Sequence, residues 1–209
     1  MQLEANNTYH IFNRGNNSQV IFFNRDNYLF FLQKIRIHIT PFADILAWCL
    51  MPNHFHLMIY INNLEIGLER KMGESKDKYG VKWGTVSKKE QNLNQSIAIM
   101  LRSYTRAINK QENRTGSLFQ MTTKATCLTD NSEITPTWFH STFGTIINIE
   151  DVDKSYPHVC FNYVHQNPVS AKLVQTPDEW EFSSYCDHAG LRNGKLINRE
   201  RTIEFGLKI

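Results

Sequence analysis

The sequence has no long apolar run and none of the usual marks of an exported chain. No stretch among its 209 residues approaches the roughly 18 consecutive apolar residues that span a bilayer. The opening residues 1–7 carry neither a basic region nor an apolar core, so we expect no signal peptide and a cytoplasmic location. These absences argue against a membrane partner.

Cysteine is scarce, and its four positions lie far apart. Cys49, Cys127, Cys160 and Cys186 form no Cys-x-x-Cys pair, which excludes the usual zinc-finger and thioredoxin spacings. Cys49 lies in an apolar run and Cys160 in a predicted helix, where a free cysteine behaves as a small buried hydrophobic residue. We therefore expect four reduced thiols.

Net charge is also low, at +3, and does not by itself indicate a nucleic-acid partner. A hydrophobic content of 41%, with 13 Phe, 8 Tyr and 4 Trp, is sufficient for a packed core. Internal repeats and low-complexity linkers are absent. The length predicts a single domain over 1–209, with insertions at about 62–86 and 129–155 and a C-terminal extension from about 186.

Hydrophobic periodicity predicts a mixture of strands and helices. The expected strands are 8–14, 43–51, 54–61 and 117–128, and the expected helices are 26–39, 87–112 and 157–167. Asp26 is the predicted N-cap of the first helix, and Ser87 begins a capping-box pattern for the second. Residues 62–86 lack a clear period and predict a mobile loop or irregular helix. Short elements are expected around 138–143 and 145–149, and no periodic element in the last thirty residues.

The most informative stretch is Met51–Ile59, which contains His54-Phe55-His56 at the start of a predicted buried strand. Because successive side chains of a strand point to opposite faces, His54 and His56 project the same way. Phe55, Leu57, Ile59 and Ile61 then form the core-facing side. Two imidazoles on one face can hold a divalent ion if a third ligand arrives from elsewhere. The alternative is one buried structural histidine beside an exposed one.

A second pair of polar side chains lies on the predicted helix before Pro168. Tyr163 and Asn167 are four residues apart and therefore share one helix face. Two imidazoles and one amide oxygen would suit a hard ion such as Mg²⁺ or Mn²⁺. A phenol beside that ion is a nucleophile for a phosphodiester. The alternative is a packed ring with a helix-end cap.

Basic residues recur every fourth position on the helix predicted over 87–112. Arg102, Arg106 and Lys110 stack along one outer face, and Arg114 and Lys124 would extend it. Such a stripe is either a solvated face or a surface that follows DNA phosphates.

Five sequence blocks together resemble the REP-associated tyrosine transposases, single-tyrosine members of the HUH endonuclease superfamily. The blocks, which occur in the family's order, are Tyr9–Asn16, Met51–Leu57, Arg114–Gln120, Tyr163–Val169 and Trp180–Tyr185. They extend over nearly the whole chain. Residues 121–124 and the length of 129–155 depart from the usual family pattern.

The resemblance implies an α+β domain, with a ferredoxin-like antiparallel sheet that carries the two histidines and helices packed on it. It implies that His54, His56 and Asn167 are metal ligands and that Tyr163 is the nucleophile. The implied activity is nicking and transfer of single-stranded, hairpin-containing DNA through a covalent 5′-phosphotyrosine. Both monomers and homodimers occur among relatives, so the oligomeric state stays open.

Other readings of the residues remain open at this stage. The chain could be a domesticated, catalytically silent protein that binds hairpin DNA, or a plain metal-binding or structural domain. A phosphoesterase with paired His-x-Thr or His-x-Ser motifs is disfavoured, because no second such pair lies on a strand. His165 is expected to be a structural histidine. The opening strand supplies further DNA-contact candidates, which are Tyr9, His10, Asn13 and Arg14.

Overall fold

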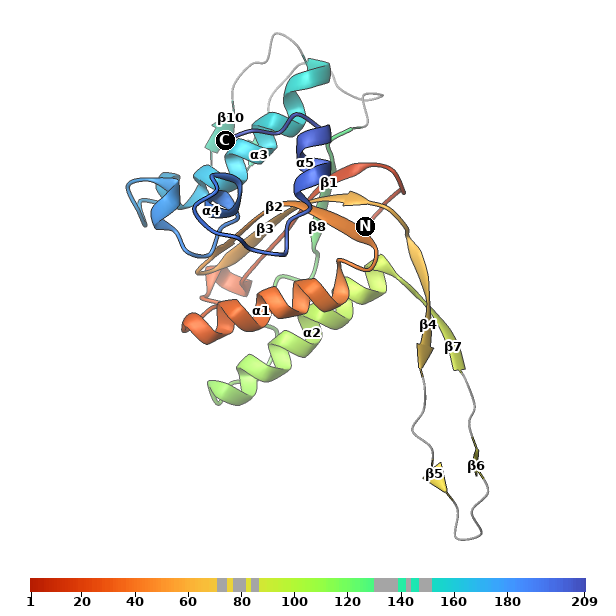
Figure 1. Ribbon diagram of the computed structural model, residues 1–209. Helices are drawn as coiled ribbons and strands as arrows, with labels where there is room; N and C mark the ends of the chain where they lie inside the picture. The colour runs from red at the N-terminus through yellow and green to blue at the C-terminus, as the bar shows by residue number, and fades with distance from the viewer. Residues whose placement is uncertain (71–74, 77–81, 84–86, 130–138, 142–143, 147–151) are drawn as a thin grey trace.

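The centre of the computed structural model is a four-stranded antiparallel sheet (Figure 1). Residues 71–74, 77–81, 84–86, 130–138, 142–143 and 147–151 lie outside the part that the structure describes. The sheet consists of β1 (Thr8–Arg14), β2 (Ala43–Met51), β3 (His54–Ile61) and β8 (Lys124–Cys127), in the order β2-β3-β1-β8. Three of these strands have the predicted bounds, whereas β8 occupies only the last part of the strand expected over 117–128.

Two helices connect these strands in the manner of a ferredoxin-like fold. Helix α1 (Arg25–His38) lies between β1 and β2, and α2 (Leu93–Gln111) lies between β3 and β8. The chain order is therefore β-α-β-β-α-β, and both helices cover the same face of the sheet (Figure 1). This arrangement confirms the expected α+β class.

The main hydrophobic core lies between that sheet face and the two helices. Phe55, Leu57, Ile59 and Ile61 are all buried there, as their alternation along β3 predicts. Helix α1 contributes Tyr28, Phe31 and Ile35 to this core. Leu29 is 41% exposed, because the aromatic side chains at positions 28 and 31 turn toward the core instead.

A two-stranded ribbon extends from the end of the sheet (Figure 1). Strand β4 (Glu65–Arg70) pairs with β7 (Ser87–Asn92), and the short strands β5 (Ser75–Lys76) and β6 (Lys82–Trp83) pair farther along the chain. The predicted loop or irregular helix over 62–86 is therefore wrong for the described residues. Ser87 begins a strand, and α2 starts only at Leu93, where the Asn92 side chain accepts a bond of 2.8 Å from the Gln95 N–H. The ribbon is largely polar in sequence, so it lacks the apolar alternation that identifies a half-buried strand.

The other face of the sheet carries α3 (Val152–Ser170), which packs against β2 and β3. Phe161 and Val164 are buried against apolar residues of these strands, including Met58. The helix continues three residues past its predicted end. Strands β9 (Phe139–Ser141) and β10 (Gly144–Ile146) pair in the segment where short elements were expected. The rest of the expected 129–155 insertion lies largely outside the described residues.

The C-terminal segment runs along the outer edge of β2. It contains the 3₁₀ turn η2 (Pro177–Glu179) and the short helices α4 (Tyr185–His188) and α5 (Arg199–Glu204), so the prediction of no regular element there is wrong. The Leu50 N–H donates to the Phe182 carbonyl at 2.8 Å. In the described part of the chain, no helix is long and apolar enough to cross a membrane.

Candidate active site

Strand β3 and helix α3 bring four of the predicted site residues together. His54 and His56 project from β3 toward α3, and their ring centroids lie 4.9 Å apart. The Tyr163 ring meets His56 edge-on, with 5.4 Å between ring centroids. The Asn167 side chain lies close enough to His54 to act on the pKa of that imidazole, which it raises against the larger effect of burial. The two histidines of β3 and the two side chains of α3 therefore meet in one place.

The hydrogen bonds of His54 determine which ring nitrogen faces the site. Its Nδ1 lies 2.6 Å from Asn53 Oδ1. Asn53 Nδ2 donates to the Ser18 carbonyl at 3.4 Å, which orients the amide so that its oxygen faces the ring. Because an amide oxygen only accepts, Nδ1 carries the proton and Nε2 presents a lone pair.

His56 has a partner that the sequence did not reveal. Its Nδ1 lies 2.8 Å from Nε2 of His10 on β1, and both rings are buried. His56 Nε2 is buried and has no hydrogen-bond partner among the described residues. If His56 Nδ1 donates its proton to His10, the unpartnered Nε2 carries a free lone pair, and a neutral imidazole in this tautomer can bind a metal.

Burial keeps these imidazoles neutral. It lowers the pKa of His10 to about 4, and it lowers that of His56 well below the usual value, with help from the neighbouring His10 and His54 rings. Burial is also the main cause that lowers the pKa of His54 to about 4, and the charge of Arg14 acts in the same direction. All three rings are therefore uncharged at neutral pH, as metal binding requires.

This geometry fits a divalent ion. Two imidazoles bound side by side to one ion at about 2.1 Å place their ring centroids roughly 5 Å apart, close to the 4.9 Å between His54 and His56. Among the described residues no group of three or more His, Cys, Asp or Glu side chains could hold an ion. The third ligand would therefore be the Asn167 amide oxygen, because Asn167 Nδ2 already donates to the Tyr163 carbonyl at 3.1 Å.

Tyr163 has the access that a nucleophile needs. Its side chain is only partly buried, whereas the neighbouring Val164 and Asn167 are buried. His10 lies edge-on to the Tyr163 ring at 6.0 Å, on the side of β1. The phenol therefore lies beside the histidines, between α3 and strands β1 and β3.

His165 attaches α3 to the edge of the sheet. Its Nε2 lies 2.7 Å from Ser184 Oγ, which also accepts from the Trp48 N–H at 2.9 Å. His165 packs edge-on against Phe161, 4.5 Å between ring centroids. This agrees with the structural role predicted for His165 and fixes the helix turn that carries Tyr163.

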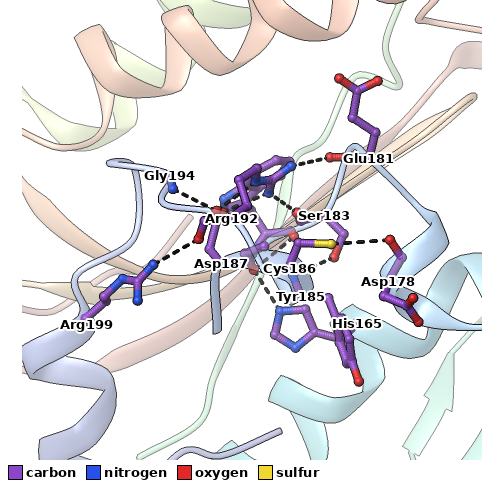
Figure 2. Close-up of polar contacts among 12 residues, drawn as sticks. His165, Asp178, Glu181, Ser183, Tyr185, Cys186, Asp187, Arg192, Gly194 and Arg199 are labelled. Atoms are coloured by element: carbon purple, nitrogen blue, oxygen red, sulfur yellow. Dashed lines mark hydrogen bonds and ion pairs between the residues drawn. The ribbon is translucent and has the colours of Figure 1, made fainter. Parts of the chain in front are cut away.

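An ion pair between the buried Asp187 and the partly exposed Arg192 holds the segment from Glu181 to Gly194 in place (Figure 2). The Asp187 carboxylate accepts from Arg192 Nε at 2.7 Å and Nη2 at 2.8 Å, and from the Gly194 N–H at 2.9 Å. A Cβ at position 194 would lie 2.5 Å from that carboxylate, so a larger residue there would have to displace it. Arg192 also donates to the backbone carbonyls of Glu181 and Ser183.

The predicted DNA-contacting residues fall into two separate groups. Arg14 and Lys124 lie on the site face, opposite His54 and Phe12 respectively in the strand register. The α2 basic stripe, Arg102, Arg106 and Lys110, is exposed on the helical layer across the sheet from Tyr163.

The remaining predicted contacts are partly or fully buried. Arg114 lies beside the stripe, where it donates to Gln19 Oε1 at 2.5 Å. Tyr9, His10 and Asn13 are buried, which disfavours the direct DNA contact expected of them. Tyr9 and Asn13 face the α1–α2 side of β1, and His10 faces the site.

Comparison with known proteins gives one informative match. No protein-family model matches the chain, and no curated protein sequence matches it. A solved structure of a REP-associated tyrosine transposase bound to a REP hairpin matches with a TM-score of 0.52, over 95% of this chain and 92% of that chain. Sequence identity is 14%, so the match shows a shared fold. The fold is thus similar to that of the family whose sequence blocks the chain resembles.

Proposed function

We propose that this chain is a metal-dependent, HUH-type tyrosine transposase that nicks and transfers single-stranded, hairpin-containing DNA. The observation that carries the proposal is the convergence of His54, His56, Asn167 and Tyr163 in one site. The similarity in fold to a transposase bound to a REP hairpin supports the choice of DNA substrate. None of these four side chains alone would indicate this chemistry.

The residues have distinct roles in holding an ion. His54 and His56 would bind it through neutral imidazole nitrogens, and Asn167 through its amide oxygen. His10 orients His56 from behind, as outer-shell partners do in metal sites. When bound, Mg²⁺ or Mn²⁺ would polarise a non-bridging phosphate oxygen and help to orient the phosphate.

Tyr163 would perform the covalent step. Its phenol oxygen loses its proton to solvent and attacks phosphorus, so that a phosphotyrosine bond forms while the bond from phosphorus to the 3′ oxygen breaks. The leaving 3′ oxygen takes up a proton and becomes a free hydroxyl. The 5′ phosphate of the downstream strand is then attached to Tyr163.

The second step reverses the first with a different strand. A 3′ hydroxyl attacks the phosphotyrosine, the bond between phosphorus and the tyrosine oxygen breaks, and Tyr163 is restored with its proton. One ester replaces another at each step, so strand transfer needs no nucleotide hydrolysis. The attachment of α3 through His165 would keep the phenol beside the site during both steps.

A covalent-adduct assay tests the proposal. Labelled single-stranded DNA from the borders of the gene is mixed with protein and Mg²⁺ or Mn²⁺, and denatured complexes are separated by electrophoresis. We expect a metal-dependent band that Tyr163→Phe abolishes. Tyr60→Phe is the matched control, because Tyr60 lies on β3 at a distance from the site and packs on Phe205. Tight DNA binding without any adduct would instead indicate a catalytically silent hairpin-binding protein.

A further inference from the structure

Phe12 is an aromatic side chain in a polar setting beside the candidate active site. It lies on β1, two residues after His10, and projects to the same face of the sheet. Its ring stacks on His10, with 4.8 Å between centroids and 25° between planes, and lies 5.9 Å from the His56 ring. Phe12 is partly exposed, unlike Phe31 and Phe55 of the main core.

The sheet face around Phe12 is basic. Helix α3 packs on β2 and β3, whereas Phe12, Arg14 and Lys124 lie on β1 and β8. Lys124 Nζ lies 5.8 Å from the centroid of the Phe12 ring. Arg14 lies opposite His54 in the β1–β3 register and is partly exposed. The Phe12 ring therefore shares its sheet face with two cations, and one of them, Lys124, lies over the ring.

The Phe12 ring is also held in a defined position. Strand β1 pairs with strands on both sides, and Phe12 has His56 as its partner on β3 and Lys124 on β8. Stacking on the buried His10 ring supports one face of Phe12. A ring that is fixed in this way loses little conformational freedom when a flat ligand packs on it.

We propose that Phe12 is the stacking platform for an unpaired base next to the scissile phosphate, with Lys124 contacting the adjoining DNA backbone. This inference rests on the proposed function and names the part of the substrate that the site recognises. Channels for single-stranded nucleic acid combine aromatic rings that stack on bases with cations that follow the phosphates. The arrangement of Phe12, Arg14 and Lys124 beside Tyr163 has both features.

The test measures binding in a Tyr163→Phe background, so that no cleavage occurs. Single-stranded 20-mers from the DNA that borders the gene each carry one 2-aminopurine, whose fluorescence falls on stacking. Phe12→Ala should weaken binding roughly 5- to 100-fold, as expected for the loss of one stacked base. Phe12→Trp should retain binding within about twofold, because indole offers a larger π face.

Phe30→Ala is the matched control. Phe30 is also partly exposed, stacks on Tyr104 at 5.9 Å and has Lys34 over its ring at 5.0 Å, but it lies on α1 across the sheet from the site. Its loss should leave DNA affinity unchanged. Circular dichroism checks that each variant is folded. In the protein that keeps Phe12, cross-linking of 5-iododeoxyuridine DNA to the peptide that contains Phe12 tests the contact without a substitution at that position.

The outcomes separate this inference from the proposed function. Loss of binding in Phe12→Ala, retention in Phe12→Trp and a cross-link at Phe12 would support the platform. Normal binding by Phe12→Ala, together with an adduct that still depends on Tyr163, would overturn the platform and leave the function standing. Equal losses in Phe12→Ala and Phe30→Ala would also overturn it, and failure of the parent protein to bind any of the 20-mers would refute both.

Discussion

Replacing Arg192 by Met should destabilise the folded protein by about 3–5 kcal/mol, the usual cost of leaving a buried charge without its partner. The Asp187 side chain is only 2% exposed, and that of Arg192 is 34% exposed. Without the guanidinium, the carboxylate keeps the Gly194 N–H at 2.9 Å but loses both short bonds from Arg192. Methionine retains much of the aliphatic stem of Arg192 but also removes the guanidinium from its place over the Trp48 ring, 5.5 Å from the ring centroid.

The chain contains a matched control for this experiment. Arg25 pairs with Glu181 at the surface, where the two side chains are 61% and 49% exposed. Arg25→Met removes the same charge and the same kind of bond, and should cost at most about 1 kcal/mol because water replaces the partner.

Urea denaturation at constant pH measures both variants. At a typical slope of 1–3 kcal/mol per molar urea, Arg192→Met should lower the midpoint by roughly 1–3 M. The double variant Arg192→Met/Asp187→Leu should recover much of the loss, because the buried carboxylate is then gone. A urea midpoint for Arg192→Met no lower than that of Arg25→Met would show that the buried Asp187 carboxylate does not depend on Arg192 for its stability.

Further predictions concern metal, pH and salt. His10→Phe keeps a ring but removes the bond to His56, so calorimetry should show Mn²⁺ affinity falling about 10- to 100-fold; an unchanged affinity would exclude the orienting role. Burial lowers the pKa of His188 in the folded state, so the unfolded chain binds the proton first and stability falls as pH drops below about 6.5. His188→Gln should therefore lose less stability than the parent between pH 7 and pH 5 in urea titrations, and an equal loss would argue against this. Alanine at all three positions of the α2 basic stripe should flatten the salt dependence of DNA affinity by up to about three in log–log slope, whereas an unchanged slope would mark the stripe as a solvated face.

The local part of the site could be predicted from the sequence because each half lies within one element. His54 and His56 share a face by the two-residue period of a strand, and Tyr163 and Asn167 share one by the four-residue spacing of a helix. Neither inference depends on where distant segments lie. Their meeting in one place was expected only from the family resemblance.

The rest depends on pairing between distant segments. The contact of His10 with His56 arises from the β1–β3 register, which aligns Phe12 with His56. The family resemblance implies that the first strand neighbours the histidine strand, but the sequence does not give the register that brings His10 to His56. The β4–β7 ribbon was missed for a different reason, since its polar composition hides the period of a strand.

The covalent linkage itself is the most direct test of the central claim. After reaction with border DNA and metal, the protein is digested with nuclease and protease, and the peptides are analysed by mass spectrometry. We predict a nucleotide joined through its 5′ phosphate to the peptide that contains Tyr163, with fragmentation placing the added mass on that tyrosine. Cleaved DNA with no modified peptide, or a nucleotide attached at a different residue, would contradict the account.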